Sequence, residues 1–186
     1  DITVGTVSGD AYGVRADDDS EVYISGARAT AVSAEGGEAY GFYSTRGSLI
    51  SGDVESIEVT SAGNNAYGIA ADKGGDIDVV LSGDVTVTST TAGSAAGVEA
   101  DTGGNVLVSG LNNLTATADT GDVIGIGASR GGDVNVLMSG VITAESKVTG
   151  DALLNAARYV RDIMEDLKAS GASSIAKDDS ILKLAT

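Results

Sequence analysis

The sequence predicts an all-β solenoid, and more specifically a parallel β-helix that we expect to be right-handed. About five coils of three strands each, with a repeat of about 28 residues, would end in a C-terminal capping α-helix. Three observations predict this fold. A glycine-containing phrase recurs at a fixed period, short apolar alternations are separated by turn residues, and Val, Ile, Ala and Gly replace the aromatic side chains of an ordinary core.

The repeat is clearest at the phrase "AYG" and its equivalents. The glycines of this phrase lie 28, 27, 29 and 28 residues apart: Gly13, Gly41, Gly68, Gly97 and Gly125. An apolar residue follows each glycine, a small residue stands two positions further on, and the residue between them varies from Arg15 to Glu99. Since side chains alternate between the two faces of a strand, the constrained positions should face inward and the variable one outward.

Two more strands complete each coil. The second alternates apolar residues and usually ends in "SG", as in "DIDVVLSG" from Asp76. The third is short, as in "VTVT" from Val85 and "LTAT" from Leu114. Coils of this kind stack because each layer leaves an unpaired strand edge and an open apolar interior.

The two ends of the chain depart from the repeat. Residues 1–9 match a third strand alone, so the first layer is incomplete and should be capped or paired with another chain. After the β-helix domain of residues 1–150, a second segment spans residues 151–186. Its apolar spacing changes from 2 to 3.6 residues, which predicts an amphipathic helix over about 152–169, with Asp151 as N-cap, laid across the last coil. A helix that docks a partner is the alternative.

The tail after this helix favours assembly. Its apolar residues Ile181, Leu182 and Leu184 should pack somewhere, and "SILKLAT" could supply a strand to the incomplete layer that contains Ile2 and Val4. A head-to-tail contact of this kind that does not close produces a filament. End-to-end self-association is therefore one predicted interaction.

Charge and composition limit the possible partners. The 186 residues include 11 Lys and Arg against 27 Asp and Glu, for a formal net charge of −16 at pH 7. This charge disfavours nucleic acid and anionic membranes. No stretch approaches the ~20 apolar residues of a membrane span, so direct membrane insertion is not expected.

The chain offers little for catalysis. It has no His and no Cys, so the commonest general base and the thiol nucleophile are both absent. Asp72 and Asp101 occupy equivalent turns of consecutive coils and could share a weak Ca²⁺ ion. Asp at a turn is ordinarily structural, and we expect no catalytic residues, no other metal site and no cofactor.

Two columns of side chains have an alternative, functional interpretation. Thr30, Glu58, Thr86, Thr115 and Thr143 are predicted to face outward on the third strand, beside a second column that runs from Val32 to Glu145. A Thr-x-Thr array of this type resembles some ice-binding surfaces, although Glu interrupts both columns. Tyr12, Tyr40 and Tyr67 share a column that strand parity places inside, as a stacked edge of the core. A platform for stacking sugars is the alternative.

The phrase "AYGIxA…GGDVxVxxSGxIxAxS" resembles the passenger repeats of bacterial autotransporters and related adhesin-like surface proteins over roughly residues 1–150. The resemblance implies a secreted Gly-rich β-helix at the bacterial cell surface, acting as an adhesin, a stalk or a scaffold for enzymatic insertions. The sequence contains no large insertion between coils, which disfavours the enzymatic version.

We therefore expect a non-enzymatic extracellular protein with a structural or adhesive role. A surface protein or glycan of a host or neighbouring cell is the expected partner. Two alternatives remain open: a self-assembling subunit of a homopolymeric surface filament, and an enzyme that acts on polysaccharide.

Overall fold

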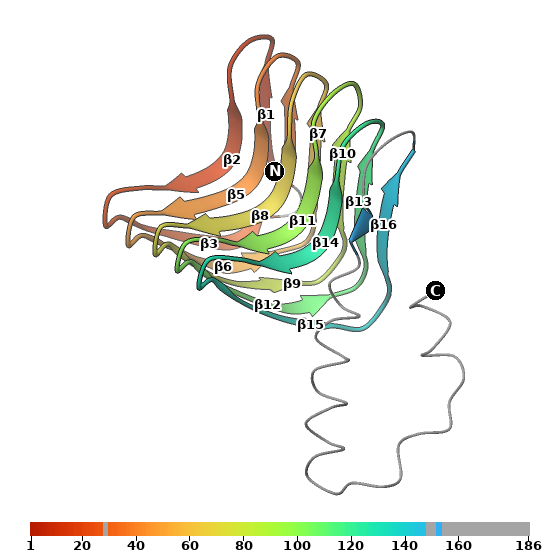
Figure 1. The fold of residues 1–186 in the computed structure, drawn as a ribbon. Helices are drawn as coiled ribbons and strands as arrows, with labels where there is room; N and C mark the ends of the chain where they lie inside the picture. Colours follow the sequence, from red (N-terminus) through yellow and green to blue (C-terminus); the bar gives the residue numbers. More distant parts are fainter. Residues whose placement is uncertain (28–29, 148–151, 154–186) are drawn as a thin grey trace, which may run out of the picture.

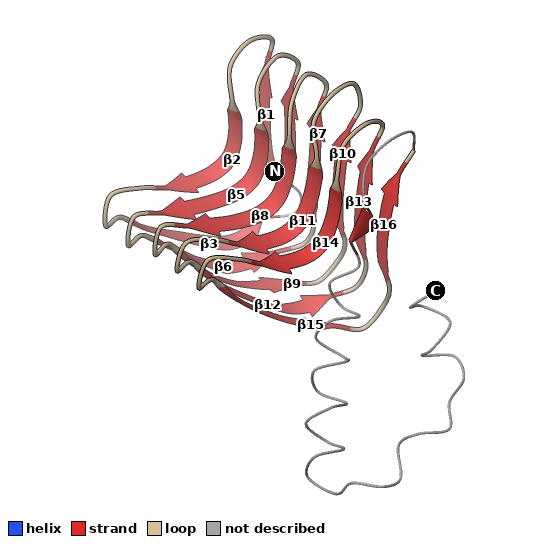
Figure 2. Cartoon of the chain, in the orientation of Figure 1, coloured by secondary structure: helices blue, strands red, loops and turns tan. Residues whose placement is uncertain are grey.

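The computed structural model describes residues 1–27, 30–147 and 152–153, and it confirms an all-β parallel solenoid of about five coils (Figures 1 and 2). Each coil contributes one strand to each of three sheets, which we call A, B and C. Neighbouring strands within every sheet come from successive coils and pair in parallel.

The strands are short and regular in length. Sheet A contains β1 (Ile2–Thr6), β4 (Thr30–Ala34), β7 (Ile57–Ser61), β10 (Val85–Ser89), β13 (Leu114–Ala118) and β16 (Ile142–Ser146). Sheet B contains β2 (Ala11–Ala16), β5 (Ala39–Thr45), β8 (Ala66–Asp72), β11 (Ala95–Ala100), β14 (Val123–Ala128) and β17 (Ala152–Leu153). Sheet C contains β3 (Glu21–Ala27), β6 (Leu49–Val54), β9 (Asp76–Leu81), β12 (Asn105–Leu111) and β15 (Asp133–Met138).

The interior is filled by stacked rows of aliphatic side chains. Ile69, Ile77 and Val85 come from the three sheets of one coil, and all three are buried. The residue after each phrase glycine was predicted to face inward, and the structure confirms this for the row from Val14 to Ile126, whose members belong to the core or pack against it. Val, Ile, Leu and Ala supply almost all of this core, and Phe42 is its one aromatic residue among the described residues.

The strands of sheet B bend along their length, so the outer side of this sheet is concave in cross-section (Figure 1). The bend coincides with the phrase glycines. A Cβ atom at Gly41 would lie 2.4 Å from the carbonyl oxygen of Gly68 and 2.6 Å from the Ile57 side chain. Gly41 therefore points into the core, and so does Phe42 directly after it. Two consecutive inward positions interrupt the alternation of the strand.

The turns from sheet B to sheet C repeat one geometry. In each of them two consecutive residues have positive φ, for example Lys73 (50°) and Gly74 (77°). This pair of conformations is that of the two central residues of a type I′ turn. The amide of Gly75 donates to the carbonyl of Asp72 at 3.0 Å and closes the turn.

The predicted C-terminal helix is not supported at its start. Ala152 and Leu153 form β17, which extends sheet B by pairing with β14. The rest of the predicted helix and the tail with Ile181, Leu182 and Leu184 lie outside the described residues. Among the residues that are described, there is no helix of a length and hydrophobicity suited to crossing a membrane.

The predicted threonine columns were wrong by one residue at β4. The register places Ala31, not Thr30, beside Glu58, and Ser33, not Val32, beside Thr60. Thr30 instead aligns with Ile57, the first residue of the inward row. The register between β3 and β6 shifts between Ile24 and Ala27, where β3 has one residue more than β6, so an equal spacing of 28 residues did not preserve the pairing.

Val79 and Val80 provide a matched test of which face of β9 is inside. Val79 is 0% exposed and Val80 is 51% exposed. Val79→Asp should destabilise the protein by about 3–5 kcal/mol because it buries an unpaired charge, whereas Val80→Asp should change stability little. Urea unfolding followed by circular dichroism measures both variants. Equal midpoints would contradict the assignment of the core.

Candidate functional site: the concave face of sheet B

The outward residues of sheet B form two rows that cross all five coils, and together we call them the concave face. The first row is Tyr12, Tyr40, Tyr67, Ala96 and Ile124. The second row is Arg15, Tyr43, Ala70, Glu99 and Gly127. The inward positions of the same strands lie between them, so these rows supply the surface that sheet B presents to a partner from the side.

The tyrosines of the first row are outside the core, and the prediction that they face inward was wrong. Strict alternation from Val14 would put Tyr12 inside. However, Gly13 and Val14 are consecutive inward positions, and the register runs from Tyr12↔Tyr40 directly to Val14↔Phe42 without a pair at the glycine. The bend at the glycine therefore reverses the parity and turns the ring outward.

The three rings are stacked, as that prediction also required. Tyr12 and Tyr40 have ring centroids 5.0 Å apart and an interplanar angle of 7°, and Tyr40 and Tyr67 are 4.7 Å apart at 8°. Tyr43, from the second row, leans against Tyr40 with a centroid distance of 4.8 Å. Four tyrosines thus form one half-buried aromatic ladder over three coils.

A polar network fixes one side of the ladder. The Tyr40 hydroxyl donates to Glu38 Oε2 at 2.6 Å, and the Asn65 side-chain amide donates to Glu38 Oε1 at 2.9 Å. Burial, followed by the charges of Glu38 and Glu99, raises the pKa of Tyr67 to about 12. Burial and the hydrogen bond to Glu38 likewise raise the pKa of Tyr40. The hydroxyls therefore stay neutral and can donate or accept hydrogen bonds at physiological pH.

A cation from the chain covers the first ring of the ladder. The Arg15 guanidinium carbon lies 4.8 Å from the centroid of Tyr12 and 5.9 Å from that of Tyr43, which are cation–π distances. Ala70 and Ala96 also face outward, yet they are only 7% and 4% exposed. Larger neighbouring side chains therefore cover both alanines, and the concave face is continuous beyond the tyrosines.

Glu99 is the carboxylate of the concave face that lacks a protein partner. Its neighbours in the row are Ala70 and Gly127, neither of which has a polar side chain. In the described part of the chain, no side chain or amide makes a hydrogen bond or ion pair with its carboxylate. Burial, and then the charge of Asp101, raises its pKa, while Arg130 opposes this shift. A half-buried, unpaired carboxylate on a concave surface is a candidate for ligand contact.

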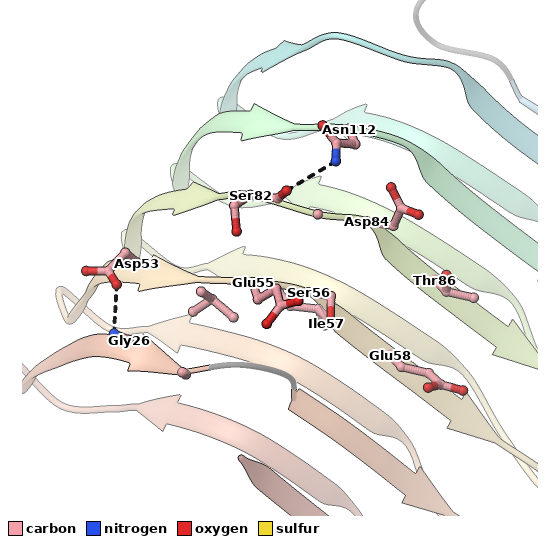
Figure 3. Close-up of a pocket in the computed structure, with 13 residues that line it drawn as sticks. Gly26, Asp53, Glu55, Ser56, Ile57, Glu58, Ser82, Asp84, Thr86 and Asn112 are labelled. Atoms are coloured by element: carbon pink, nitrogen blue, oxygen red, sulfur yellow. Dashed lines mark hydrogen bonds between the residues drawn. The ribbon is translucent and has the colours of Figure 1, made fainter.

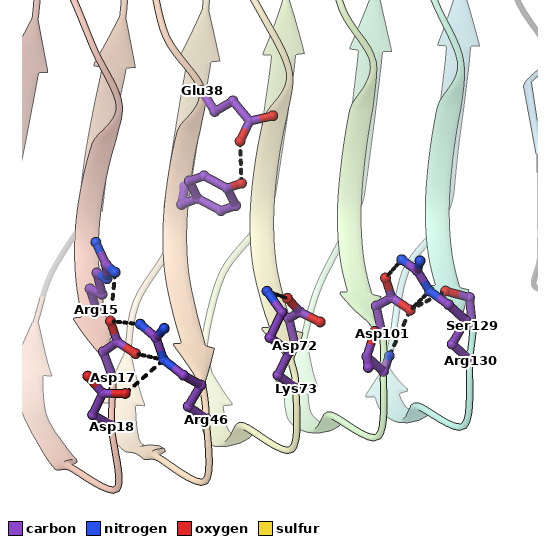
Figure 4. A network of polar contacts seen from close by, with 12 residues as sticks. Arg15, Asp17, Asp18, Glu38, Arg46, Asp72, Lys73, Asp101, Ser129 and Arg130 are labelled. Atoms are coloured by element: carbon purple, nitrogen blue, oxygen red, sulfur yellow. Dashed lines mark hydrogen bonds and ion pairs between the residues drawn. The ribbon is translucent and has the colours of Figure 1, made fainter.

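Ion pairs between coils mark the edge of the concave face at the turns into sheet C (Figure 4). The Arg46 guanidinium donates to both oxygens of Asp17 in the preceding coil, at 2.7 and 2.6 Å. Arg130 pairs in the same way with Asp101, 29 residues earlier. These guanidinium groups lower the pKa of Asp101 and bring that of Asp17 to about 2. The pairs fasten adjacent turns to each other.

The two predicted calcium ligands have other contacts. Asp101 accepts hydrogen bonds from Arg130, from the Ser129 hydroxyl at 2.8 Å and from the Thr102 amide at 2.7 Å. Asp72 pairs with Lys73 at 3.0 Å. Within the described residues, no cluster of three or more acidic side chains has the arrangement of a metal site. The calcium site stays a prediction, and it would require these ion pairs to open.

A second hollow lies at the opposite corner, where sheet C turns into sheet A (Figure 3). It has a volume of about 860 Å³ and is lined by carboxylates such as Asp53, Glu55 and Asp84. Asp53 accepts a hydrogen bond from the amide of Gly26 at 2.7 Å, and Asp84 accepts two from Asn113 at 3.0 Å. Asp53 and Asp84 therefore cap amides of adjacent coils, which gives both carboxylates a structural role at this hollow.

Of the residues predicted to mediate assembly, the structure describes only the two near the N-terminus. Ile2 and Val4 lie on β1, pair with Thr30 and Val32, and are only partly buried against the core. Their counterparts Val85 and Val87 are fully buried because a coil covers them on each side. Ile181, Leu182 and Leu184 lie outside the described residues, so contact between the two groups stays a prediction.

Sequence reasoning overlooked Arg15, Tyr43 and Glu99 as a group, because their column appeared to have nothing in common. A signal was present, since Tyr12, Tyr40 and Tyr43 are three of the six tyrosines of the chain and fall within two coils. The second repeat has Tyr40 directly before the phrase glycine and Tyr43 at the variable position. Two tyrosines at these positions would have indicated that both positions lie on the same outer face.

The chain matches no family model, and it has no significant similarity to the curated proteins or to the solved structures with which it was compared.

The ion pairs at the turns predict a stability that depends on acid. Because the pKa values of Asp17 and Asp101 are lowered by folding, the stabilisation is complete above the ordinary aspartate pKa of about 3.9 and is lost as the pH falls towards 2. The melting temperature of the Asp17→Asn, Asp101→Asn double variant should therefore fall less between pH 4 and pH 2 than that of the unmodified chain. Asp78→Asn, at an exposed position of sheet C, is the control. Equal acid sensitivity in all three proteins would contradict the prediction.

Proposed function

We propose that this chain is a non-enzymatic adhesive module displayed at the cell surface, and that the concave face of sheet B is its contact surface. The observation that supports this proposal is the aromatic ladder. Four tyrosines gather on the outside of a strand row where charged or small residues would suffice for folding. Tyr is enriched in binding surfaces because it combines a large apolar ring with a polar end.

The scaffold suits adhesion in a second way. Stacked coils place equivalent residues of successive repeats in rows, so the solenoid offers an extended contact surface rather than a single pocket. The extracellular location rests on the resemblance of the repeats to autotransporter passengers, and this resemblance is an argument from analogy. The acidic surface, with a net charge of −16, favours uncharged or basic partners.

A specific observation favours an enzymatic alternative, namely the raised pKa of Glu99 near the ion-paired Asp101. Two carboxyl groups with different pKa values can act in glycoside hydrolysis, the one with the higher pKa as general acid and the ionised one as base or nucleophile. However, Arg130 and Ser129 occupy the oxygens of Asp101. We therefore favour binding over hydrolysis. Release of reducing ends from neutral polysaccharides, abolished by Glu99→Gln, would reverse this preference.

Self-assembly into a filament is the second alternative. Ile2 and Val4 are partly buried where equivalent residues of inner coils are fully covered, so an additional coil from another copy could cover them. The Ile2→Asp, Val4→Asp double variant should then have a lower molar mass by light scattering than the unmodified protein at high concentration. A scattering mass of one chain, both with and without the substitutions, would exclude this alternative.

Bead adhesion tests the proposed function directly. Fluorescent beads coated with the chain should be retained under flow on a confluent epithelial layer or on a bacterial lawn. The Tyr40→Ala, Tyr67→Ala double variant should reduce retention several-fold, because it removes the centre of the ladder. Tyr23→Ala is the matched control, since Tyr23 lies on sheet C with 73% of its surface exposed.

Circular dichroism and thermal melting must accompany this comparison, because Tyr40 and Tyr67 are half-buried. Beads coated with a folded double variant that are retained as well as unmodified beads would show that the concave face is not the adhesive surface. Equal loss with Tyr23→Ala would also refute the proposal, since it would indicate nonspecific aromatic contact.

A further inference from the structure

We propose that the concave face binds an amine-bearing glycan, a β-1,4-linked chain of glucosamine-type sugars, along the tyrosine ladder, with a ligand ammonium group at Glu99. This inference rests on the proposed adhesive function and assigns it a chemical class of ligand. Three properties of the face carry it: partly uncovered ring surfaces, an unoccupied cation position and an excess of carboxylates.

The geometry of the ladder leaves ring surface available for stacking. Carbon atoms in contact are about 3.5–4.0 Å apart, so parallel rings whose centroids are 4.7–5.0 Å apart must be offset. An offset exposes part of each ring face to solvent. Tyr67 ends the ladder, because Ala96 is its neighbour in the next coil. The apolar faces of sugar rings pack against aromatic surfaces of this kind.

The spacing of the rungs also suits an extended glycan. Neighbouring parallel strands are about 4.8 Å apart, which is close to the advance per sugar of a β-1,4-linked pyranose chain. A chain that runs along the solenoid axis would therefore place about one sugar beside each coil. Because successive β-1,4-linked sugars are flipped, it would present the same groups to every second coil. The hydroxyls of Tyr40 and Tyr67 lie along one side of this path. Tyr40 already donates to Glu38 and can accept from a sugar hydroxyl, whereas Tyr67 accepts from Asn65 and can donate to one.

Arg15 indicates that this aromatic surface accommodates a cation. Its guanidinium lies over Tyr12 and Tyr43 in the first coils. The equivalent residue two coils further on is Ala70, which cannot reach over Tyr67. A ligand ammonium could take the corresponding place there, beside the unpaired carboxylate of Glu99, and would then gain both a cation–π contact and an ion pair.

The charges of the face distinguish between classes of glycan. Asp10, Glu38 and Glu99 contribute carboxylates next to the ladder, and Arg15 contributes a cation that the chain itself already uses. Arg130, whose charge also acts on Glu99, is ion-paired with Asp101. Sulfated or uronate-bearing glycans would be repelled by this arrangement. Both oxygens of Glu38 already accept hydrogen bonds from Tyr40 and Asn65. Glu99 is therefore the carboxylate available to a ligand.

Calorimetric titration of the full chain with three defined probes tests the inference. The probes are a glucosamine hexamer, an N-acetylglucosamine hexamer and a heparin-derived hexasaccharide. The glucosamine hexamer should bind best, and the heparin fragment should not bind. Glu99→Gln should weaken binding of the glucosamine hexamer about tenfold, because it removes the charge and keeps the shape, and should affect the acetylated hexamer much less.

Two further variants separate ring stacking from folding effects. Tyr67→Ala should weaken both uncharged and amine-bearing hexamers, whereas Tyr67→Phe should retain most of the binding and confirm that the site remains folded. Glu58→Gln, which removes an exposed carboxylate on sheet A, is the matched control for Glu99→Gln and should have no effect.

Several results would overturn the inference: binding of the heparin fragment, equal binding of the acetylated and free hexamers, loss of affinity with Glu58→Gln, or no binding of any hexamer. Binding of polylysine without binding of the glucosamine hexamer would also overturn it and would indicate a basic protein partner. If the glucosamine hexamer does not bind but bead retention still depends on Tyr40 and Tyr67, the glycan assignment fails and the adhesive function stands.

Discussion

The constraint on which this structure depends is the in-register hydrogen bonding of parallel strands from successive coils. Tyr67, Ile69 and Ala70 of β8, for example, each lie beside an equivalent residue of β5 and of β11. The pairing turns a sequence repeat of about 28 residues into rows of side chains that cross the whole solenoid. Every inward row must then be uncharged, because a charge in it would be buried between two other coils. The buried Ser44 and Ser61 are tolerated because their hydroxyls donate to backbone carbonyls. Outward rows have no such restriction, and any function of the solenoid wall must be built from them.

The concave face shows how a bend turns such a row into a candidate site. The phrase glycines allow the backbone of one coil to approach that of the next within a distance that a Cβ atom would block. The same glycines let sheet B curve, so its outer rows converge instead of lying flat. Tyr12, Tyr40 and Tyr43 consequently contact one another across rows as well as along them. Burial on this face raises the pKa of Tyr67 and of Glu99, and the charges of Glu38 and Asp101, respectively, add to the two shifts.

Structural and functional charges can be separated on this surface. Asp17 and Asp101 have arginine partners from the next coil, and their lowered pKa values reflect that pairing. These carboxylates hold turns together, and the same is true of Asp53 and Asp84, which accept hydrogen bonds from neighbouring backbone amides. Glu99 has a raised pKa and no such partner, which is why we assign contact with a ligand to Glu99. A repeated acidic residue at a turn is therefore weaker evidence for a metal site than its spacing suggests.

The sequence by itself determined the solenoid, the number of coils, the three strands of each coil and the inward row from Val14 to Ile126, because periodic apolar residues are required wherever coils stack. The sequence also contained the tyrosine column, although strict alternation assigned the column to the wrong face. Only the tertiary structure decided that face, since a bend at Gly13 and Gly41 changes the parity in a way that counting cannot detect. Only the tertiary structure shows the shift of Thr30 into register with Ile57, because it arises from an irregular pairing of β3 with β6 between Ile24 and Ala27. The tertiary structure likewise decided that Asp101 has an ion-pair partner and that Glu99 has none among the described residues, since residues 28 or 29 positions apart meet only when the coils stack.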